Sequence, residues 1–198
     1  GSHPTTTQAD GHLLEYFRNT FLQGGGGTNA IAGSGLEATG GTISDYTVGS
    51  DVYRAHIFTN TGTFNVTSVG PFGADIEYMV VAGGGGGGGD NNNGSGGGGG
   101  GAGGFRTNLS GHPYAPYGHT FTVAASGTYP VTIGAGGGGT MDPPGTANQG
   151  GNSVLTHPVT SPMTVTATGG GGGANENASG VTGGGGGSGG GGSRGGDG

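Results

Sequence analysis

"IEYMVVAGGGGGGGDNNNGSGGGGGGAGGF", which runs from Ile76 to Phe105, decides how this 198-residue chain can fold. An apolar, β-branched run leads directly into seven consecutive glycines, and six more glycines follow a short polar break. Such a run has the composition of a buried β-strand. The same order recurs downstream in "YPVTIGAGGGG" (129–139), "MTVTATGGGGG" (163–173) and "SGVTGGGGG" (179–187). This recurrence indicates an ordered repeat.

An ordered glycine run needs neighbours that satisfy its backbone. Polyglycine can adopt the extended three-residue-per-turn helix of polyproline, which has no internal hydrogen bonds. Each N–H and C=O must then bond to an adjacent segment, and only Gly fits where backbones touch. The alternative is a flexible Gly/Ser linker, against which the scarcity of Ser inside the runs argues. We therefore expect packed polyglycine-II rods.

Composition excludes several classes of protein. Gly makes up 59 residues in solid runs with only nine Pro, which is not the collagen pattern. The absence of Cys excludes disulfides and thiolate metal sites. A net charge of −7 with four scattered arginines and no lysine argues against a nucleic-acid partner. Because no 18-residue apolar stretch occurs, we expect no membrane insertion.

The residues before the first glycine run predict a short helix followed by strands. In "GHLLEYFRNTFLQ" (11–23), apolar residues at i, i+4 and i+8 predict an amphipathic helix that packs on its own domain or on a neighbouring subunit. "DVYRAHIFT" (51–59) and "TGTFNVT" (61–67) alternate in polarity across a turn and predict a hairpin. "DIEYMVV" (75–81) predicts a third strand. We expect His56, at mid-strand, to be a structural or surface histidine.

The predicted fold class is mainly β plus a polyglycine-II helix bundle. It comprises a short N-terminal helix, a small β-sandwich-like domain, and packed glycine-rich rods joined by exposed loops. The predicted domains are an N-terminal arm (1–23), a small β domain (28–82) and a glycine-rich domain (83–198). Because the last residues stop inside a Gly-rich pattern, we expect the natural chain to continue beyond Gly198.

Several motifs together resemble a known family. They are "YRAHIFTNTGTFNV" (53–66), "IEYMVVAGGGGGGG" (76–89), "GGFRTN" (103–108), "FTVAASGTYPVTIGAGGGG" (121–139), "GGNSVL" (150–155) and "TVTATGGGGG" (164–173). From about Asp51 to the end, the chain resembles the glycine-rich domain of phage tail-fibre proteins, especially those of marine and cyanobacterial phages. It is similar in principle to the adhesins at the fibre tips of T-even-like phages.

The resemblance implies a receptor-binding module located in the virion tail fibre and therefore extracellular. Packed polyglycine helices would form a rigid platform, and the joining loops would bind a host cell-surface glycan or outer-membrane protein. It also implies a homo-oligomer, a trimer formed through the N-terminal half, or a fibre. Some fibre tips of this kind carry His-x-His iron sites; no such pair occurs here, so we predict no metal and no cofactor.

The loops expected to contact the receptor are 90–95, 108–119, 140–149 and 174–179. Tyr and His rings can stack on sugars, and Asn amides suit carbohydrate hydroxyls. Two alternatives stay open, namely that the tyrosines cap the glycine platform and that the asparagines only form turns. The predicted receptor-binding residues are Asn91, Asn92, Asn93, His112, Tyr114, Tyr117, His119, Met141, Asp142, Asn175, Glu176 and Asn177.

Catalysis finds no support in the motifs, and we predict that the chain is not an enzyme. The glycine runs match GxGxxG, but no helix follows them and no Lys is available for a P-loop. The HExxH motif does not occur. The alternative function is a structural, self-assembling virion or extracellular fibre without a receptor. An ice-binding protein would need a flat, regular Gly-x-x array, which the irregular loops and long pure-Gly runs disfavour.

Overall fold

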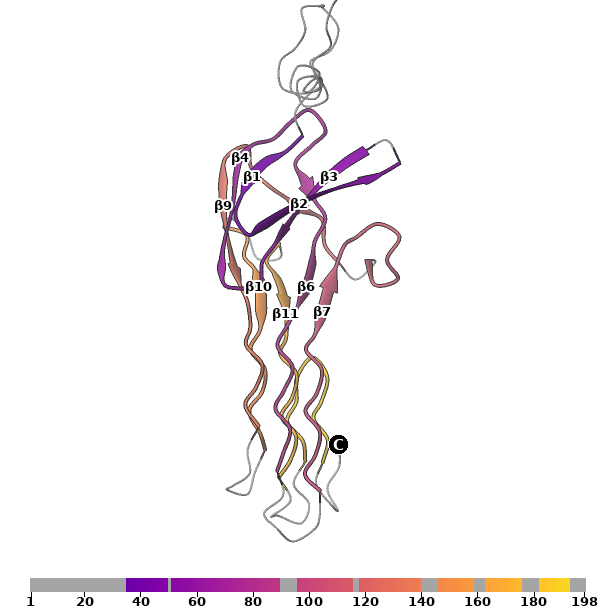
Figure 1. Ribbon diagram of the computed structural model, residues 1–198, viewed down its shortest axis with the longest axis vertical. Coiled ribbons are helices and arrows are strands. Elements are labelled where there is room, and N and C mark those ends of the chain that lie inside the picture. The colour runs from indigo at the N-terminus through magenta and orange to yellow at the C-terminus, as the bar shows by residue number, and fades with distance from the viewer. Residues whose placement is uncertain are drawn as a thin grey trace, which may run out of the picture.

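In the computed structural model, the described residues are 35–49, 51–89, 96–115, 118–139, 146–158, 163–175 and 182–192. They form an elongated molecule with short β-sheets at one end. Glycine segments run side by side from these sheets along the long axis to the other end (Figure 1). The predicted amphipathic helix at 11–23 lies outside the described residues.

The largest sheet is antiparallel and has the strand order β1-β4-β9-β10-β11. Burial alternates along β4 and β9, as expected for strands with one face on a core. Phe64 of β4 lies directly opposite Tyr129 of β9, and both are buried. The strands are β1 (Glu37–Thr39), β4 (Gly62–Ser68), β9 (Gly127–Thr132), β10 (Ser153–Leu155) and β11 (Val165–Ala167).

Aromatic side chains form the centre of the core. The rings of Phe121 and Tyr129, which are 0% and 1% exposed, meet edge to face with centroids 5.7 Å apart. Tyr78 also contacts Phe121, with ring centroids 6.3 Å apart. The Tyr129 hydroxyl accepts a hydrogen bond from the Ala124 N–H. Because glycines bury no side chain, these few large rings supply much of the hydrophobic stabilisation.

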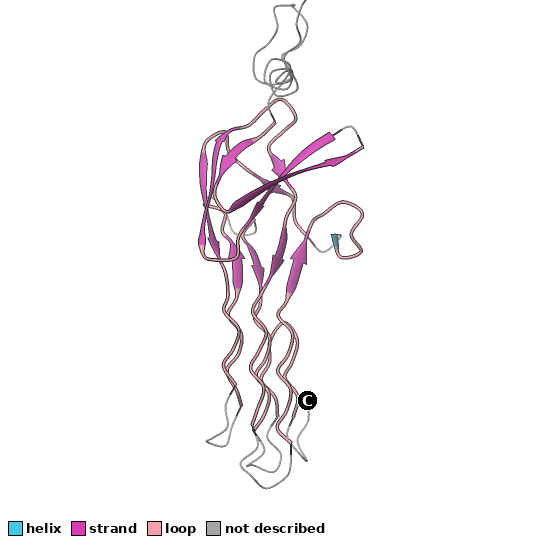
Figure 2. Ribbon diagram, in the orientation of Figure 1, coloured by secondary structure: helices cyan, strands magenta, loops and turns pink. Residues whose placement is uncertain are grey.

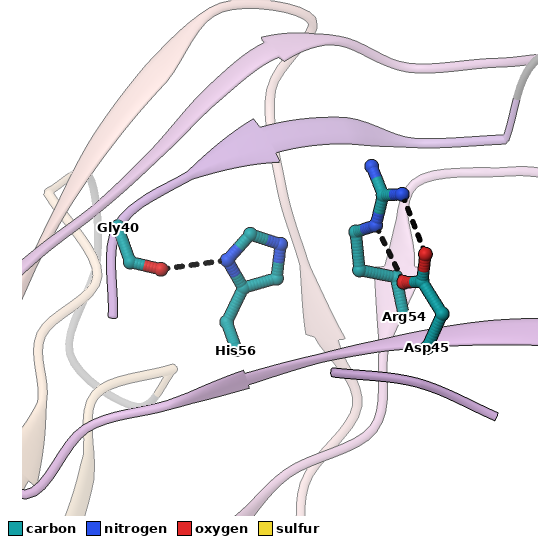
Figure 3. Close-up of polar contacts among 4 residues, drawn as sticks. All are labelled: Gly40, Asp45, Arg54 and His56. Atoms are coloured by element: carbon teal, nitrogen blue, oxygen red, sulfur yellow. Dashed lines mark hydrogen bonds and ion pairs between the residues drawn. The ribbon is translucent and has the colours of Figure 1, made fainter. Parts of the chain in front are cut away.

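Three two-stranded sheets complete the strand region. The β2–β3 hairpin projects from the body (Figures 1 and 2). Its base is held by His56, whose Nδ1 donates to the Gly40 carbonyl at 2.8 Å (Figure 3) and whose ring packs against Phe64. His56 is therefore a structural histidine. The pairs are β2 (Thr42–Val48) with β3 (Asp51–Ile57), β5 (Asp75–Ile76) with β8 (Phe121–Thr122), and β6 (Met79–Val81) with β7 (Phe105–Thr107).

Hydrogen bonds between the glycine segments repeat every third residue. Along segment 82–89, two amides in every three donate to different neighbours at 2.8–3.0 Å, and each neighbour is met again three residues later. The donors to segment 98–104 are Ala82, Gly85 and Gly88. The donors to segment 148–151 are Gly83 and Gly86. This periodicity is that of an extended backbone with three residues per turn, which cannot bond to itself.

Segment 168–175 lies at the centre of these glycine segments. Its Gly169–Gly173 stretch is buried and is bonded to segments on several sides. A Cβ atom on Gly171 would overlap the carbonyl oxygen of Gly184, and one on Gly173 would overlap that of Gly98. Only glycine can occupy such positions, because neighbouring backbones are in direct contact there.

The predicted fold class is wrong. The described residues contain no α-helix, only Ala115 has 3₁₀ geometry (Figure 2), and the sheets are small and unclosed. Most strands are short, and several of them adjoin glycine segments, so too few side chains remain to build two facing sheets. Small open sheets that continue into extended glycine segments take the place of the predicted β-sandwich-like domain.

Two of the predicted strand arrangements are also wrong. β3 pairs with β2 over its full length, whereas β4 pairs with β1 and β9, so 51–59 and 61–67 form no hairpin with each other. The predicted strand at 75–81 is split into β5 and β6. The split occurs because the Tyr78 N–H donates to the Asn108 side chain at 2.7 Å and therefore cannot donate to a neighbouring strand.

Candidate functional site

The 108–119 loop leaves β7 and projects from the side of the molecule (Figure 1). Asn108 holds its base, because the side-chain Nδ2 donates to the carbonyls of Ile76 and His119 at 3.0 and 3.2 Å. Its Oδ1 accepts the Tyr78 N–H described above. One side chain thus joins both ends of the loop to the strand region.

Turns shape the rest of the loop. The His112 N–H donates to Leu109 O at 3.1 Å, and Ala115 donates in turn to His112 O at 2.9 Å. Gly118 then donates to Ala115 O at 2.9 Å. Gly111 has a φ of 78°, in the left-handed region that glycine favours. Each of these bonds joins residues three positions apart, as in a β-turn, so the described part of the loop has a defined backbone path.

Three aromatic rings meet where the loop lies beside β7. The centroid of Phe105 is 5.3 Å from that of His112 and 6.2 Å from that of Tyr114. The His112 and Tyr114 centroids are 5.7 Å apart, and His112 Nδ1 accepts the Tyr114 N–H at 3.2 Å. Tyr114 nevertheless keeps 61% of its surface exposed. The cluster therefore fixes the position of a tyrosine that is open to solvent.

A shallow hollow of about 260 Å³ opens beside this aromatic cluster. Arg106 lies at the hollow with an exposed side chain, and its Nη1 donates to the carbonyl of Phe105 at 3.5 Å. Arg106 forms no ion pair with any carboxylate of the described residues. The lining residues include Phe105, Arg106, Thr107, Tyr114, Thr168 and Gly187.

The other described arginine has a different environment. Arg54 of β3 forms a two-pronged contact with Asp45 of β2, with Nε and Nη2 at 2.7 and 2.8 Å from the carboxylate oxygens (Figure 3). Hydrogen bonding from the guanidinium lowers the pKa of Asp45, and the same contact raises the pKa of Arg54. Arg54 is therefore neutralised locally, whereas Arg106 is not.

The structure describes four of the predicted receptor-binding residues. His112 and Tyr114 come together in the aromatic cluster, and the His119 N–H donates to the Tyr78 hydroxyl at 3.0 Å. Asn175 is 2% exposed, and its Oδ1 accepts the Gly89 N–H at 3.0 Å, which links the ends of two glycine segments. Outside the described residues lie Asn91, Asn92, Asn93, Tyr117, Met141, Asp142, Glu176 and Asn177.

Sequence reasoning missed Phe105 and Arg106 as members of this site. They stand in "GGFRTN" directly after a glycine run, which marks the point where the chain re-enters a strand. An aromatic residue followed by a cation at that point was the available signal. The 108–119 loop folds back to this point, and only the tertiary structure reveals that contact.

Metal sites and membrane helices are not found in the part of the chain that the structure describes. No group of three His, Asp or Glu side chains gathers there in a way that could hold a metal ion. No helix in the same residues is long and apolar enough to cross a membrane.

Comparison with known proteins identifies the family. The glycine-rich domain family matches residues 58–198, which is more than half of the chain. The chain belongs to the glycine-rich domain family. This match begins just before β4, so it covers most of the five-stranded sheet, the 108–119 loop and all the glycine segments. No curated protein and no solved structure matches the chain.

Proposed function

We propose that this glycine-rich domain is a receptor-binding module of a phage tail fibre, which presents loops on a rigid base for recognition of a host surface. The observation that carries the proposal is the hydrogen bonding of the glycine segments to one another at about every third residue. A base held by so many inter-segment bonds keeps the loop ends in place, which lowers the entropy that binding costs.

The 108–119 loop is the proposed receptor-binding element that the geometry describes best. The Asn108 clamp fixes its base and the aromatic cluster fixes Tyr114 in an exposed position. Exposed, positioned aromatic rings suit recognition, since they bury large areas with little loss of side-chain freedom. The proposed partner is a host cell-surface glycan or outer-membrane protein, the location is the virion, and no enzymatic activity is proposed.

Loop exchange tests the proposal. We would replace residues 109–118 with a Gly/Ser segment of equal length, keeping Asn108 and His119, and measure binding of the labelled chain to a panel of marine bacterial and cyanobacterial cells. A Phe72→Ser variant is a matched surface control, because Phe72 is 81% exposed and lies outside the loop. We expect the loop variant to lose cell binding while it keeps the melting temperature of the parent chain. We expect the Phe72→Ser variant to keep both. Unchanged binding of the loop variant to every cell that the parent binds would refute the proposal.

A second candidate function, a self-assembling fibre protein without a receptor, is favoured by the β2–β3 hairpin. This hairpin carries the stacked rings of Tyr46 and Tyr53, 5.5 Å apart, together with Val48 and Ile57. These four side chains are between 41% and 58% exposed. A two-stranded hairpin alone is marginally stable in water, so a covering partner would stabilise it.

We propose that a second copy of this chain covers the exposed apolar side chains of that hairpin, in a homo-oligomer that the tail-fibre resemblance suggests is a trimer. Sedimentation velocity of the chain and of a Tyr46→Ser/Tyr53→Ser variant tests this, with Phe72→Ser as the control. We expect the double variant alone to dissociate. If the double variant dissociates and still binds cells, self-association and receptor binding are separate properties. If the parent chain is monomeric at all concentrations, the proposed oligomer is refuted.

A further inference from the structure

Arg106 is an exposed cation with no acidic partner among the described residues, in a chain of net charge −7. An acidic chain repels anions at long range, so its overall field gives no reason for an anion to approach. Any attraction must come from the local guanidinium. Arg presents a planar fork of N–H donors that matches a carboxylate or a phosphate.

The neighbours of Arg106 suit a sugar ring. Tyr114 lines the same hollow with most of its surface exposed, and its ring is held by contacts with Phe105 and His112. A fixed aromatic face packs well against the C–H face of a pyranose ring. Thr168, also exposed at the hollow, offers a hydroxyl that can donate and accept.

The size of the hollow limits what it can hold. Its volume of about 260 Å³ is below the range of roughly 300–1,000 Å³ for pockets that enclose drug-sized ligands. One sugar residue of a longer chain therefore fits better than an enclosed oligosaccharide.

We propose that this hollow binds one acidic sugar residue, with Arg106 pairing with its carboxylate or phosphate group and Tyr114 packing on its ring. The inference rests on the proposed function, because it names the chemical class of the receptor that the module recognises. It assigns the charge preference to Arg106, a residue outside the loops that the sequence predicted to contact the receptor.

The test is an NMR titration of the ¹⁵N-labelled full chain with three separate probes: glucuronate, glucose 6-phosphate and glucose. We expect saturable shifts at the amides of Arg106, Tyr114 and Gly187 with one or both acidic sugars, and weaker binding of glucose. If glucuronate binds more tightly, the preferred anion is a carboxylate; if glucose 6-phosphate binds more tightly, it is a phosphate. Added salt should weaken the acidic probes and leave glucose unchanged.

Two variants of equal charge change separate a local effect from a general one. Arg106→Gln should weaken the acidic sugar by about fivefold or more, whereas Arg54→Gln, which removes the same charge from the hairpin, should leave it unchanged. Tyr114→Ala should weaken acidic and neutral sugars alike. Retained amide shifts of β4 and β9 in each variant would show that the fold is intact.

Equal binding of glucose and the acidic sugars, or equal losses in the two arginine variants, would overturn the inference. So would the absence of binding by any probe at millimolar concentration. If loop exchange still abolishes cell binding in those cases, the proposed receptor-binding function stands and only the acidic-sugar assignment fails. If loop exchange has no effect on cell binding, the proposed function itself fails.

Discussion

The packing of segment 168–175 predicts that a single methyl group at Gly171 will destabilise the whole molecule. In Gly171→Ala the new Cβ overlaps the carbonyl oxygen of Gly184, which is backbone and cannot rotate away. The segments must separate, which disrupts two hydrogen bonds of residue 171. Its N–H donates to Ser188 O at 2.8 Å, and its carbonyl accepts the Gly101 N–H at 2.7 Å.

The magnitude follows from these contacts. Two disrupted buried bonds cost about 1–2 kcal/mol each, and overpacking adds about 1–3 kcal/mol. The lower entropy of the unfolded alanine chain offsets about 0.4–1 kcal/mol. The free energy of unfolding should therefore fall by about 2–7 kcal/mol. This is a large fraction of the roughly 5–15 kcal/mol that typically stabilises a domain.

Gly87→Ala is the matched control. Gly87 belongs to a neighbouring glycine segment, is exposed, and has no atom within 4 Å of the position that a Cβ would take. The same substitution there should raise stability by about 0.4–1 kcal/mol. Both variants would be unfolded in urea at one protein concentration, followed by circular dichroism and tyrosine fluorescence. Equal unfolding midpoints for the two variants would refute the claim that backbone contact excludes side chains from segment 168–175.

Three further predictions concern the segments, the loop and the hairpin. Along 83–88, amide hydrogen exchange should be fast at Gly84 and Gly87, which donate no hydrogen bond within the described residues. It should be slow at the four donors, Gly83, Gly85, Gly86 and Gly88. Uniform exchange along the segment would contradict the three-residue repeat. Asn108→Ala should speed exchange at His112 and Ala115 and leave β4 and β9 unchanged, because it frees the loop base; unaltered loop exchange would show that the clamp is dispensable. Arg54→Gln should return the pKa of Asp45 toward its ordinary value of 3.8, as followed by carboxyl NMR. Because the pKa of Asp45 is lowered in the folded state, the Asp45–Arg54 contact stabilises the hairpin above about pH 3.8. This stabilisation is lost as the pH falls through the folded-state pKa of Asp45. A hairpin stability that does not change over this pH window would contradict the prediction.

The sequence predicted local features and failed where pairing between distant segments decided the outcome. The run "TGTFNVT" (61–67) and the apolar start of "YPVTIGAGGGG" (129–139) predicted strands, and β4 and β9 lie there. Their pairing with each other, about 60 residues apart, had no local signal. The expected hairpin between 51–59 and 61–67 does not form, because β3 pairs over its full length with β2, the strand immediately before it.

The candidate site shows the same division. The two tyrosines and two histidines of "GHPYAPYGH" (111–119) predicted an exposed loop with side chains suited to binding. The contribution of Phe105 and Arg106 was not, because it depends on the loop folding back over β7. Asn175 was predicted to bind the receptor because its amide lies in a joining loop and suits carbohydrate hydroxyls, yet its side chain is buried and links the ends of two glycine segments.

By itself the sequence determined that strands lead into glycine segments, and that those segments must touch one another through their backbones. The reason is local, since only glycine tolerates such contact and its amides need outside partners. Tertiary structure alone decided which segment lies at the centre and which neighbours each one meets. All glycine segments have the same backbone chemistry, so their order is set by the distant side chains of the strands that precede them.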